Sequence, residues 1–546
     1  MAANPFVGVI FHWLGGLASG SFYVPYRQVK KWSWEVSWLV GGFFSWIIAP
    51  WVMAIAITGV LFPVLREAPA SSCFWAYFWG AMWGLGGLTF GLTMRYLGMS
   101  LGMAVALSYC SVFGTLMPPL FNGTLVDKFS TTSGLWIAAG IVVCVLGIVV
   151  TGMAGVSKDR EMSEEKKREA IKEFSFWKGI LVATFSGVMS ASFSYGLAAG
   201  DPIKDLTLKH SFLKAAQADG LSVTNPLPIA SADEKTLWEE MQKSQVPAVA
   251  RMVKSLASEK TVHCGAVATY MEKCVGNAEA DTAALASFLT QSQNPAAVTL
   301  CKSKYFSDYQ TECVANARAE VDAIASCLSQ SQSPAAAELV KYDAERSKIQ
   351  DPEVRRQPAA YSSFDLKRVA VQIASAGGDM NKYVAKHTLW QGLPVLVVVL
   401  LGGFTTNFIW CILLNLKNRT GYQYFNSTLR RQPAAQGADA AGSAVADAPK
   451  AERVPMLNNY FFCAVAGVTW YLQFFFYTMG ETQMGNYKFS SWTLHMASII
   501  IFSSLWGIAL KEWKGSGAGT KRKLSYGLAM LILSTIIIGY GNYLGA

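Results

Sequence analysis

Residues 134–153 have the sequence GLWIAAGIVVCVLGIVVTGM, a run of twenty residues without a charged side chain. A helix rises about 1.5 Å per residue, so this run would cover about 30 Å, the thickness of the hydrocarbon core of a bilayer. Backbone polar groups in lipid must be hydrogen-bonded within the segment, which a helix achieves. The stretch therefore predicts a transmembrane helix.

Similar apolar runs recur along the chain, which has 546 residues, 52% hydrophobic and only 15% charged. Soluble proteins carry about 25% charged residues, so much of this surface is expected to avoid water. No basic region precedes the first run, so we expect a retained span rather than a cleaved signal peptide. We predict an all-α membrane protein with ten spans, at residues 6–23, 36–57, 74–94, 97–121, 134–153, 179–199, 390–414, 460–480, 492–510 and 524–544.

The loops between these spans differ strongly in basic residues. Loops that follow odd-numbered spans hold 22 Lys and Arg, whereas the short loops on the other side hold only Arg66, Lys128 and Lys488. Because positively charged loops stay in the cytoplasm, we predict that both termini and residues 200–388 are extracytoplasmic. The net charge of +10 thus reflects membrane topology, and we expect no nucleic-acid partner.

The connection between spans six and seven is a long polar insert. Its Ala, Glu, Gln, Lys and Ser favour helices, so we divide the chain into a transmembrane part at 1–199, an α-helical repeat insert at 200–388 and transmembrane helices seven to ten at 389–546. Segment 274–297 resembles segment 313–336 at a constant offset of 39 residues, and both contain Ser-Gln-x-Pro-Ala-Ala. Pro interrupts helices, so each repeat is predicted to be a helical hairpin.

The insert also contains five of the ten cysteines. An oxidising compartment permits disulfides, which stabilise small helical modules. Four of these cysteines form two similarly spaced pairs, Cys264 with Cys274 and Cys301 with Cys313, although the connectivity stays open. A zinc site is the weaker alternative, because His263 is the one nearby histidine and no close C-x-x-C pair is present. We therefore expect disulfides and no metal.

Ionisable side chains within membrane spans are costly and mark function. His12 in span one and His495 in span nine fall at similar depth in the predicted topology. Histidine takes up and releases protons near neutral pH, so both are candidates for proton coupling. The alternative is a neutral histidine that is hydrogen-bonded between helices.

Other polar and aromatic residues are candidates for substrate binding or proton coupling. Residues 470–477, WYLQFFFY, combine one amide, Gln473, with aromatic faces that suit the C–H faces and hydroxyls of a sugar. Packing against lipid is the alternative for this stripe. Glu35 and Arg95 lie near span ends, where snorkelling is the alternative. The remaining candidates are Tyr23, Asn407, Tyr471 and Tyr477.

Several ordered strings resemble the L-rhamnose–proton symporter family. They are YRQVKKWSWE at 26–35, GAMWG at 80–84, GLTMRYLGMS at 91–100, WYLQFFFY at 470–477, WTLHM at 492–496 and KEW at 511–513. The resemblance covers about residues 6–200 and 389–545. It implies a ten-helix fold of the drug/metabolite transporter superfamily and symport of a 6-deoxyhexose with a proton. Five helices in each half would give the two inverted halves seen in many transporters.

The chain departs from the family's pattern in the insert, in the loop at 420–454 and in Tyr109-Cys110-Ser111. The expected function is therefore a proton-coupled symporter that imports L-rhamnose or a related monosaccharide across the inner membrane. One alternative is another small solute, and a second is a sensor whose repeats bind a sugar or a protein partner without net transport. We expect no enzyme and no cofactor beyond the coupled proton, because no phosphate-binding loop or H-E-x-x-H motif is present.

Overall fold

The computed structural model describes residues 4–97, 99–121, 123–161, 176–256, 263–291, 295–351, 354–355, 357–361, 363–428 and 453–545. Within these residues the chain is helical, and the one β-bridge joins Thr428 to Arg453. The predicted all-α class is thus confirmed. The chain folds as two compact units, residues 1–204 with 388–546 (unit 1) and residues 205–387 (unit 2).

Unit 1 contains the apolar helices, although one apolar segment, Met380–Asn418, begins with residues of unit 2. Among the described residues, eight segments are long and apolar enough to cross a membrane: Pro5–Tyr26, Trp34–Thr58, Thr132–Lys158, Trp177–Ala199, Met380–Asn418, Met456–Thr482, Gly485–Ala509 and Ala518–Leu544. The other two predicted spans lie in α6 (Ala70–Leu97) and α7 (Met99–Phe121), which are helical but not in this set of eight. The count of ten spans therefore stays a prediction.

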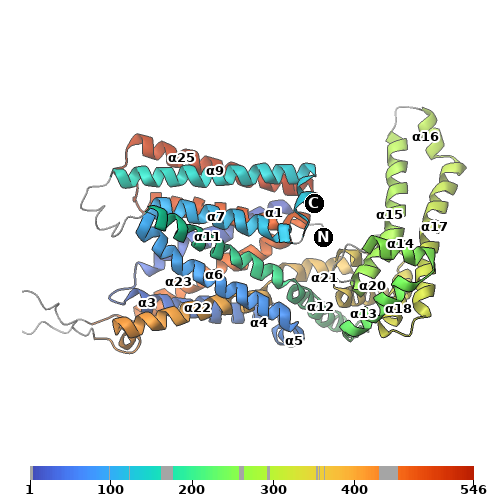
Figure 1. Ribbon diagram of the computed structural model, residues 1–546, viewed down its shortest axis with the longest axis horizontal. Coiled ribbons are helices and arrows are strands. Elements are labelled where there is room, and N and C mark those ends of the chain that lie inside the picture. Colours follow the sequence, from blue (N-terminus) through green and yellow to red (C-terminus); the bar gives the residue numbers. More distant parts are fainter. Residues whose placement is uncertain are drawn as a thin grey trace, which may run out of the picture. The chain divides into compact units, whose positions relative to one another are not determined.

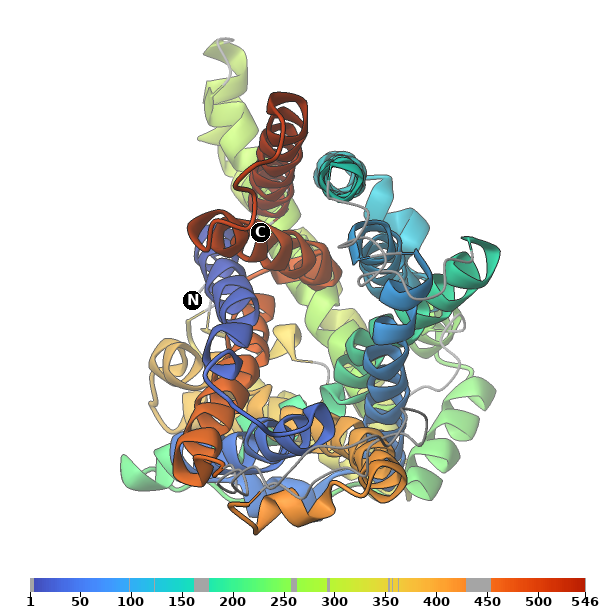
Figure 2. The ribbon, with the colours of Figure 1, turned by 90° about the vertical axis from the view of Figure 1, so that its left-hand side faces the viewer.

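The helices of unit 1 pack in pairs with distant partners in the sequence. Helix α1 (Pro5–Ser21) contacts both α23 (Met456–Thr482) and α24 (Ser491–Ala509), and α1 can be followed in dark blue beside the orange-red α23 in Figure 2. Helices α9 (Thr132–Arg160) and α25 (Ala518–Leu544) lie along each other (Figure 1). Other helices of this unit are α2 (Tyr23–Tyr26), α5 (Leu61–Glu67), α8 (Leu125–Phe129), α11 (Phe176–Ala199) and α22 (Leu393–Asn418).

The second span contains a change of helix type. Helix α3 (Trp34–Gly42) continues into a π-helix, η1 (Phe43–Ile48), and then into α4 (Ala49–Thr58). Pro50 is the physical cause, because it has no N–H to donate to the carbonyl four residues earlier and its ring would clash with that carbonyl. The extra residue per turn redirects the side chains of this segment, and such π turns are frequent at functional sites.

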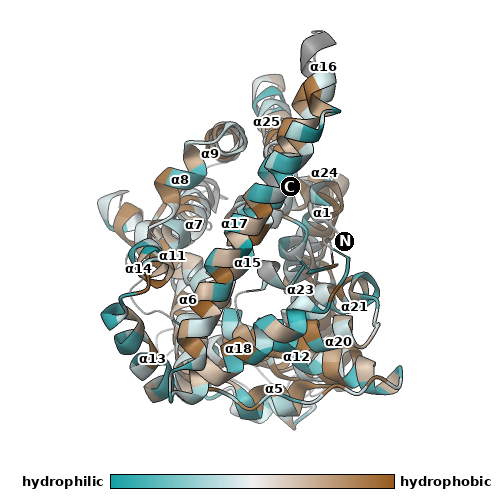
Figure 3. Ribbon diagram, turned by 90° about the vertical axis from the view of Figure 1, so that its right-hand side faces the viewer, coloured by the Kyte–Doolittle hydropathy of each residue, from teal (hydrophilic) through white to brown (hydrophobic). Residues whose placement is uncertain are grey.

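Unit 2 consists of shorter amphipathic helices. They are α12 (Asp201–Ala218, from residue 205 onward), α13 (Ser231–Lys243), α14 (Pro247–Leu256), α15 (Cys264–Gln291), α16 (Pro295–Cys301), α17 (Lys304–Ser329), α18 (Pro334–Ser347), α20 (Phe364–Ser375) and α21 (Met380–His387). The Pro of each Ser-Gln-x-Pro motif is the first residue of a helix, the position that tolerates a missing N–H. The predicted breaks in the repeats are therefore present, and hydrophilic and hydrophobic residues alternate along these helices (Figure 3).

The core of unit 2 is apolar but contains a fully buried ion pair. Leu237, Met252 and Val321 belong to its largest hydrophobic cluster. Lys367 Nζ donates to Glu272 Oε2 over 2.8 Å, with both side chains at most 1% exposed. Burial lowers the pKa of Lys367, since the interior disfavours its charged form.

The structure leaves the four predicted disulfide cysteines as free thiols. Cys264 and Cys274 lie ten residues apart on α15, about 15 Å along a helix axis. A disulfide requires Cα atoms within about 7 Å, so a bond between these two does not fit this helix. Bonds that involve Cys301 or Cys313 stay a prediction.

Candidate functional site

The two predicted histidines meet inside unit 1. His12 on α1 and His495 on α24 are both fully buried, and their ring centroids lie 6.5 Å apart. None of their ring nitrogens has a hydrogen-bond partner among the described residues. Buried polar groups are nearly always hydrogen-bonded, so an unpartnered pair is an exception that calls for a function.

Aromatic rings enclose this pair. Tyr477 on α23 lies 5.3 Å from His12 and 5.2 Å from His495, between centroids, so it bridges the two. Trp492 lies 6.3 Å from His495 and donates its Nε1–H to the carbonyl of Cys110 on α7. The histidines therefore belong to one buried cluster of rings, here called the histidine cluster, formed by α1, α23 and α24 and bonded to α7.

Small residues allow this close approach. A Cβ at Gly480 would lie 2.8 Å from the His12 ring, and a Cβ at Gly15 would lie 3.3 Å from the His495 ring. A side chain at Gly480 would force the His12 ring to shift, and one at Gly15 would press on the His495 ring. The glycines thus fix how near the helices bring the rings.

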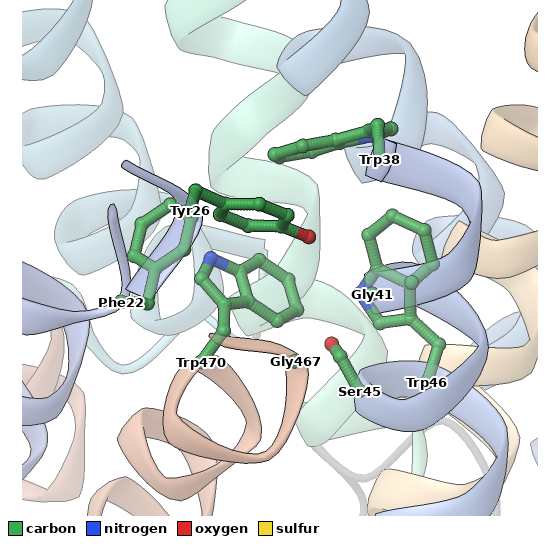
Figure 4. Close-up of a pocket in the computed structure, with 9 residues that line it drawn as sticks. Phe22, Tyr26, Trp38, Gly41, Ser45, Trp46, Gly467 and Trp470 are labelled. Carbon is green, nitrogen blue, oxygen red and sulfur yellow. The ribbon is translucent and has the colours of Figure 1, made fainter. Parts of the chain in front are cut away.

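A second feature is a pocket lined largely by aromatic residues (Figure 4). Its lining residues are Phe22, Tyr26, Trp38, Gly41, Gly42, Ser45, Trp46, Gly467 and Trp470. The hydroxyls of Tyr26 and Ser45 point into the space between the indole rings. Ser45 Oγ and Trp46 Nε1 are buried and have no hydrogen-bond partner among the described residues. Aromatic faces combined with unpaired donors are the groups that bind a sugar ring.

The π-helix supplies two of these lining side chains. Ser45 and Trp46 both lie in η1, four to five residues before Pro50. Without the extra residue in that turn, their side chains would point about one helical position away. The pocket therefore depends on the backbone irregularity that Pro50 causes.

A continuous row of rings joins the pocket to the histidines. Trp470 lies 5.5 Å from Trp46 and 5.0 Å from Phe474, between centroids. Phe474 in turn lies 6.5 Å from His495. The aromatic face of α23 therefore contacts both the pocket and the histidine cluster.

An ion pair lies one turn beyond Tyr477. Lys204 Nζ donates to both carboxylate oxygens of Glu481, at 3.2 and 3.0 Å, and also lies 2.9 Å from Asp201. Burial alone would lower the pKa of Lys204, but the two carboxylates raise it above its usual value. Lys204 is therefore charged at neutral pH and holds the end of α23.

The other predicted residues lie in different places. Gln473 and Tyr471 are buried on α23, and the Tyr471 hydroxyl has no hydrogen-bond partner among the described residues. Asn407 Oδ1 accepts from Nε1 of Trp38, a pocket residue. Tyr23 is 59% exposed, and its ring lies tilted against the pocket residue Phe22 with centroids 4.0 Å apart.

Glu35 does not join the histidines. Glu35 Oε1 accepts hydrogen bonds from Asn418 Nδ2 at 3.0 Å and Thr420 Oγ1 at 2.7 Å. These bonds hold Glu35 to the C-terminal end of α22, and its part in binding or coupling stays a prediction. The Arg95 side chain lies outside the described residues.

The sequence reasoning missed the pocket residues Tyr26, Trp38, Ser45 and Trp46. The sequence feature that pointed to this region was Pro50 within an apolar run, because a proline inside a span distorts the helical turn before it. A larger cavity of about 380 Å³ lies between α7 and α9, but its lining is almost entirely apolar and includes Tyr109 and Met153. It offers a sugar the hydroxyls of Ser108 and Tyr109, and the Ser108 hydroxyl has no hydrogen-bond partner among the described residues.

The fold and the site together define a multi-pass helical membrane protein with a buried polar centre. The family described as L-rhamnose-proton symport protein (RhaT) matches residues 1–221 and 441–543. The chain therefore belongs to this family, as the sequence strings indicated. The match leaves out residues 222–440, which hold most of unit 2 and helix α22.

Curated relatives have the same description. An "L-rhamnose-proton symporter" of Klebsiella pneumoniae subsp. pneumoniae is 37% identical over 199 residues, which are 36% of this chain and 56% of the relative. Relatives of Cronobacter sakazakii and Escherichia coli are 35% and 36% identical over 220 residues, 40% of this chain and 61% of each relative. The chain thus spans less than two thirds of the length of these relatives. No solved structure matches the chain.

Proposed function

We propose that the protein is a proton-coupled symporter that imports L-rhamnose or a related monosaccharide. The observation that carries this proposal is the buried histidine pair beside a pocket of aromatic faces that includes the Ser45 hydroxyl. The ring nitrogens of both histidines and the Ser45 hydroxyl have no hydrogen-bond partner among the described residues. Family membership and the description of its relatives as L-rhamnose-proton symporters support it.

In this proposal the pocket widens to bind the sugar, because its free volume of about 10 Å³ in this structure is too small for a monosaccharide. The indoles of Trp38, Trp46 and Trp470 contact its C–H faces, while Ser45 Oγ and Tyr26 Oη exchange hydrogen bonds with its hydroxyls. L-Rhamnose lacks a hydroxyl at carbon 6, so one end of it is apolar. A pocket with many rings and few polar groups fits such a sugar.

The proton would bind to the histidine pair. The two buried imidazole rings have centroids 6.5 Å apart, so charging both would cost much free energy. The pair would therefore take up one additional proton at a time. Protonation would place a charge against Tyr477 and the aromatic face of α23 that contacts the pocket. Sugar and proton would thereby influence each other through α23.

We further propose ten spans arranged as two inverted five-helix halves in the inner membrane. The packing supports this arrangement. Helix α1 contacts α23 and α24, and its proposed counterpart α11 contacts α6 and α7, the proposed counterparts of α23 and α24. The last helices of the two proposed halves, α9 and α25, pair with each other. The positions of basic loop residues favour both termini and unit 2 on the extracytoplasmic side.

The test is uptake of labelled L-rhamnose by proteoliposomes with and without an inward proton gradient. Accumulation above the external concentration that a protonophore abolishes is the expected result. Uptake of another monosaccharide alone would correct the substrate. Binding of L-rhamnose without net uptake under either condition would contradict transport and favour the sensor alternative.

A further inference from the structure

The two sequence repeats of unit 2 have different surroundings. The first copy, 274–297, covers the second half of α15 and the start of α16, and the second copy, 313–336, covers the equivalent parts of α17 and α18. Helices with matching sequences would be expected to bury matching positions. The structure departs from this expectation.

In the second copy the apolar positions are in the core. Ile324 is 0% exposed and Leu328 is 2% exposed, and Leu339, just beyond the copy, is 0% exposed. All three belong to one cluster with residues of α13 and α14, which cover this face. The second copy is therefore a complete packing unit.

In the first copy the positions that correspond to Ile324 and Leu339 are exposed, whereas Leu289, which corresponds to Leu328, is half-buried. Leu285 corresponds to Ile324 and is 38% exposed, and Leu300 corresponds to Leu339 and is 49% exposed. Phe288, which corresponds to Cys327, is 72% exposed. Two tyrosines at the start of α17, Tyr305 and Tyr309, are 83% and 50% exposed.

These five exposed residues, here called the tip patch, belong to a hairpin of α15 and α17 closed by α16 (Figure 1). Repeat modules bury such faces against a neighbouring module. No helix of the described chain takes the place at the first copy that α13 and α14 take at the second. The tip patch is therefore an apolar surface that no other helix of the described chain covers.

We propose that the tip patch is an interface between two copies of this chain, packed tip against tip about a twofold axis. The charges around the patch fit a second copy. Lys302 and Lys304 lie exposed where α16 meets α17, while Asp281 and Glu312 lie exposed farther from the tip. Antiparallel packing would set the lysines of each copy against the carboxylates of the other, as a self-complementary twofold contact requires.

The dimer can be tested by counting subunits of the full-length protein in lipid nanodiscs. Phe288→Glu places charge in the patch and should weaken dimerisation at least tenfold. Leu227→Glu is the matched control, because Leu227 is 83% exposed elsewhere in unit 2, and it should leave the dimer unchanged.

Charge reversal tests the arrangement independently of any folding defect. Lys304→Glu and Asp281→Lys should each weaken the dimer, and the two together in one chain should restore it. A monomeric wild-type protein at micromolar concentration would overturn the proposal. So would a dimer that is equally stable with Phe288→Glu and Leu227→Glu.

Discussion

At the scale of single residues, the buried groups without hydrogen-bond partners carry the functional argument. His12, His495 and Ser45 are all shielded from solvent within apolar helices. A polar group in this situation costs free energy unless something binds to it. Proteins retain such groups where a proton or a ligand supplies the missing partner during function.

Replacing either histidine should uncouple sugar from protons. His12→Ala or His495→Ala removes half of the proposed proton site, so L-rhamnose should no longer accumulate in response to an imposed proton gradient. The measurement is steady-state accumulation in proteoliposomes. His263→Ala is the control, since His263 bonds to Glu234 in unit 2 and should not affect accumulation. Full accumulation by both variants would show that neither histidine couples.

Removing the pocket hydroxyl should weaken sugar binding without abolishing it. A hydrogen bond contributes about 0.5–1.5 kcal/mol, so Ser45→Ala should raise the KM for sugar uptake by about two- to tenfold. Ser37→Ala is the matched control, because its hydroxyl already donates to the carbonyls of Ser33 and Trp34. An unchanged KM for Ser45→Ala would place the sugar elsewhere.

At the scale of helices, glycine positions decide which faces touch. A Cβ at Gly16 would overlap the side chain of Ser498 on α24, and Ser498 Oγ donates to the carbonyls of His12 and His495. The same contact therefore sets the helix spacing and orders the backbone beside both histidines. Gly87 on α6, by contrast, has no atom within 4 Å of its added Cβ.

The contrast between Gly16 and Gly87 predicts that replacing each of them with alanine has different effects on the stability of the protein. Gly16→Ala should destabilise the protein by about 1–3 kcal/mol, because the added methyl overpacks the α1–α24 contact. Gly87→Ala should be neutral or stabilise by about 0.5–1 kcal/mol, because alanine favours a helix interior. Thermal unfolding of both variants in detergent measures the difference. Equal midpoints for the two variants would contradict the close approach of α1 and α24.

At the scale of the whole chain, the candidate site lies entirely in unit 1. The residues of the family match also lie mainly in that unit, whereas most of unit 2 falls outside the match. Unit 2 has its own core and its own buried ion pair. Its role is therefore expected to be separable from the recognition of sugar.

Replacing residues 205–387 by a flexible Gly/Ser linker tests that separation. We expect the KM for sugar uptake to stay within about twofold of the wild type, because every pocket and histidine residue remains. The same deletion with Ser45→Ala should again raise the KM, which shows that uptake still uses the pocket. A tenfold higher KM for the deletion alone would assign substrate capture to unit 2.

The sequence by itself determined the elements and the family. Apolar runs long enough to cross a bilayer force helices, because lipid offers no other partner for backbone polar groups. Rare ionisable residues in those runs, such as His12 and His495, were identifiable as candidates because charge there is costly. The helix breaks of unit 2 followed from its prolines.

Only the tertiary structure decided which residues meet. It brought His12 and His495 together although 483 positions separate them, and it assigned Glu35 to the end of α22. It also placed Ser45 and Trp46 in the aromatic pocket. In unit 2 it left apolar residues of the first repeat exposed and buried the corresponding residues of the second. Such outcomes depend on which helix faces pack against each other, and many faces of similar hydrophobicity could do so. Local sequence fixes helices, whereas close packing between distant segments selects the site.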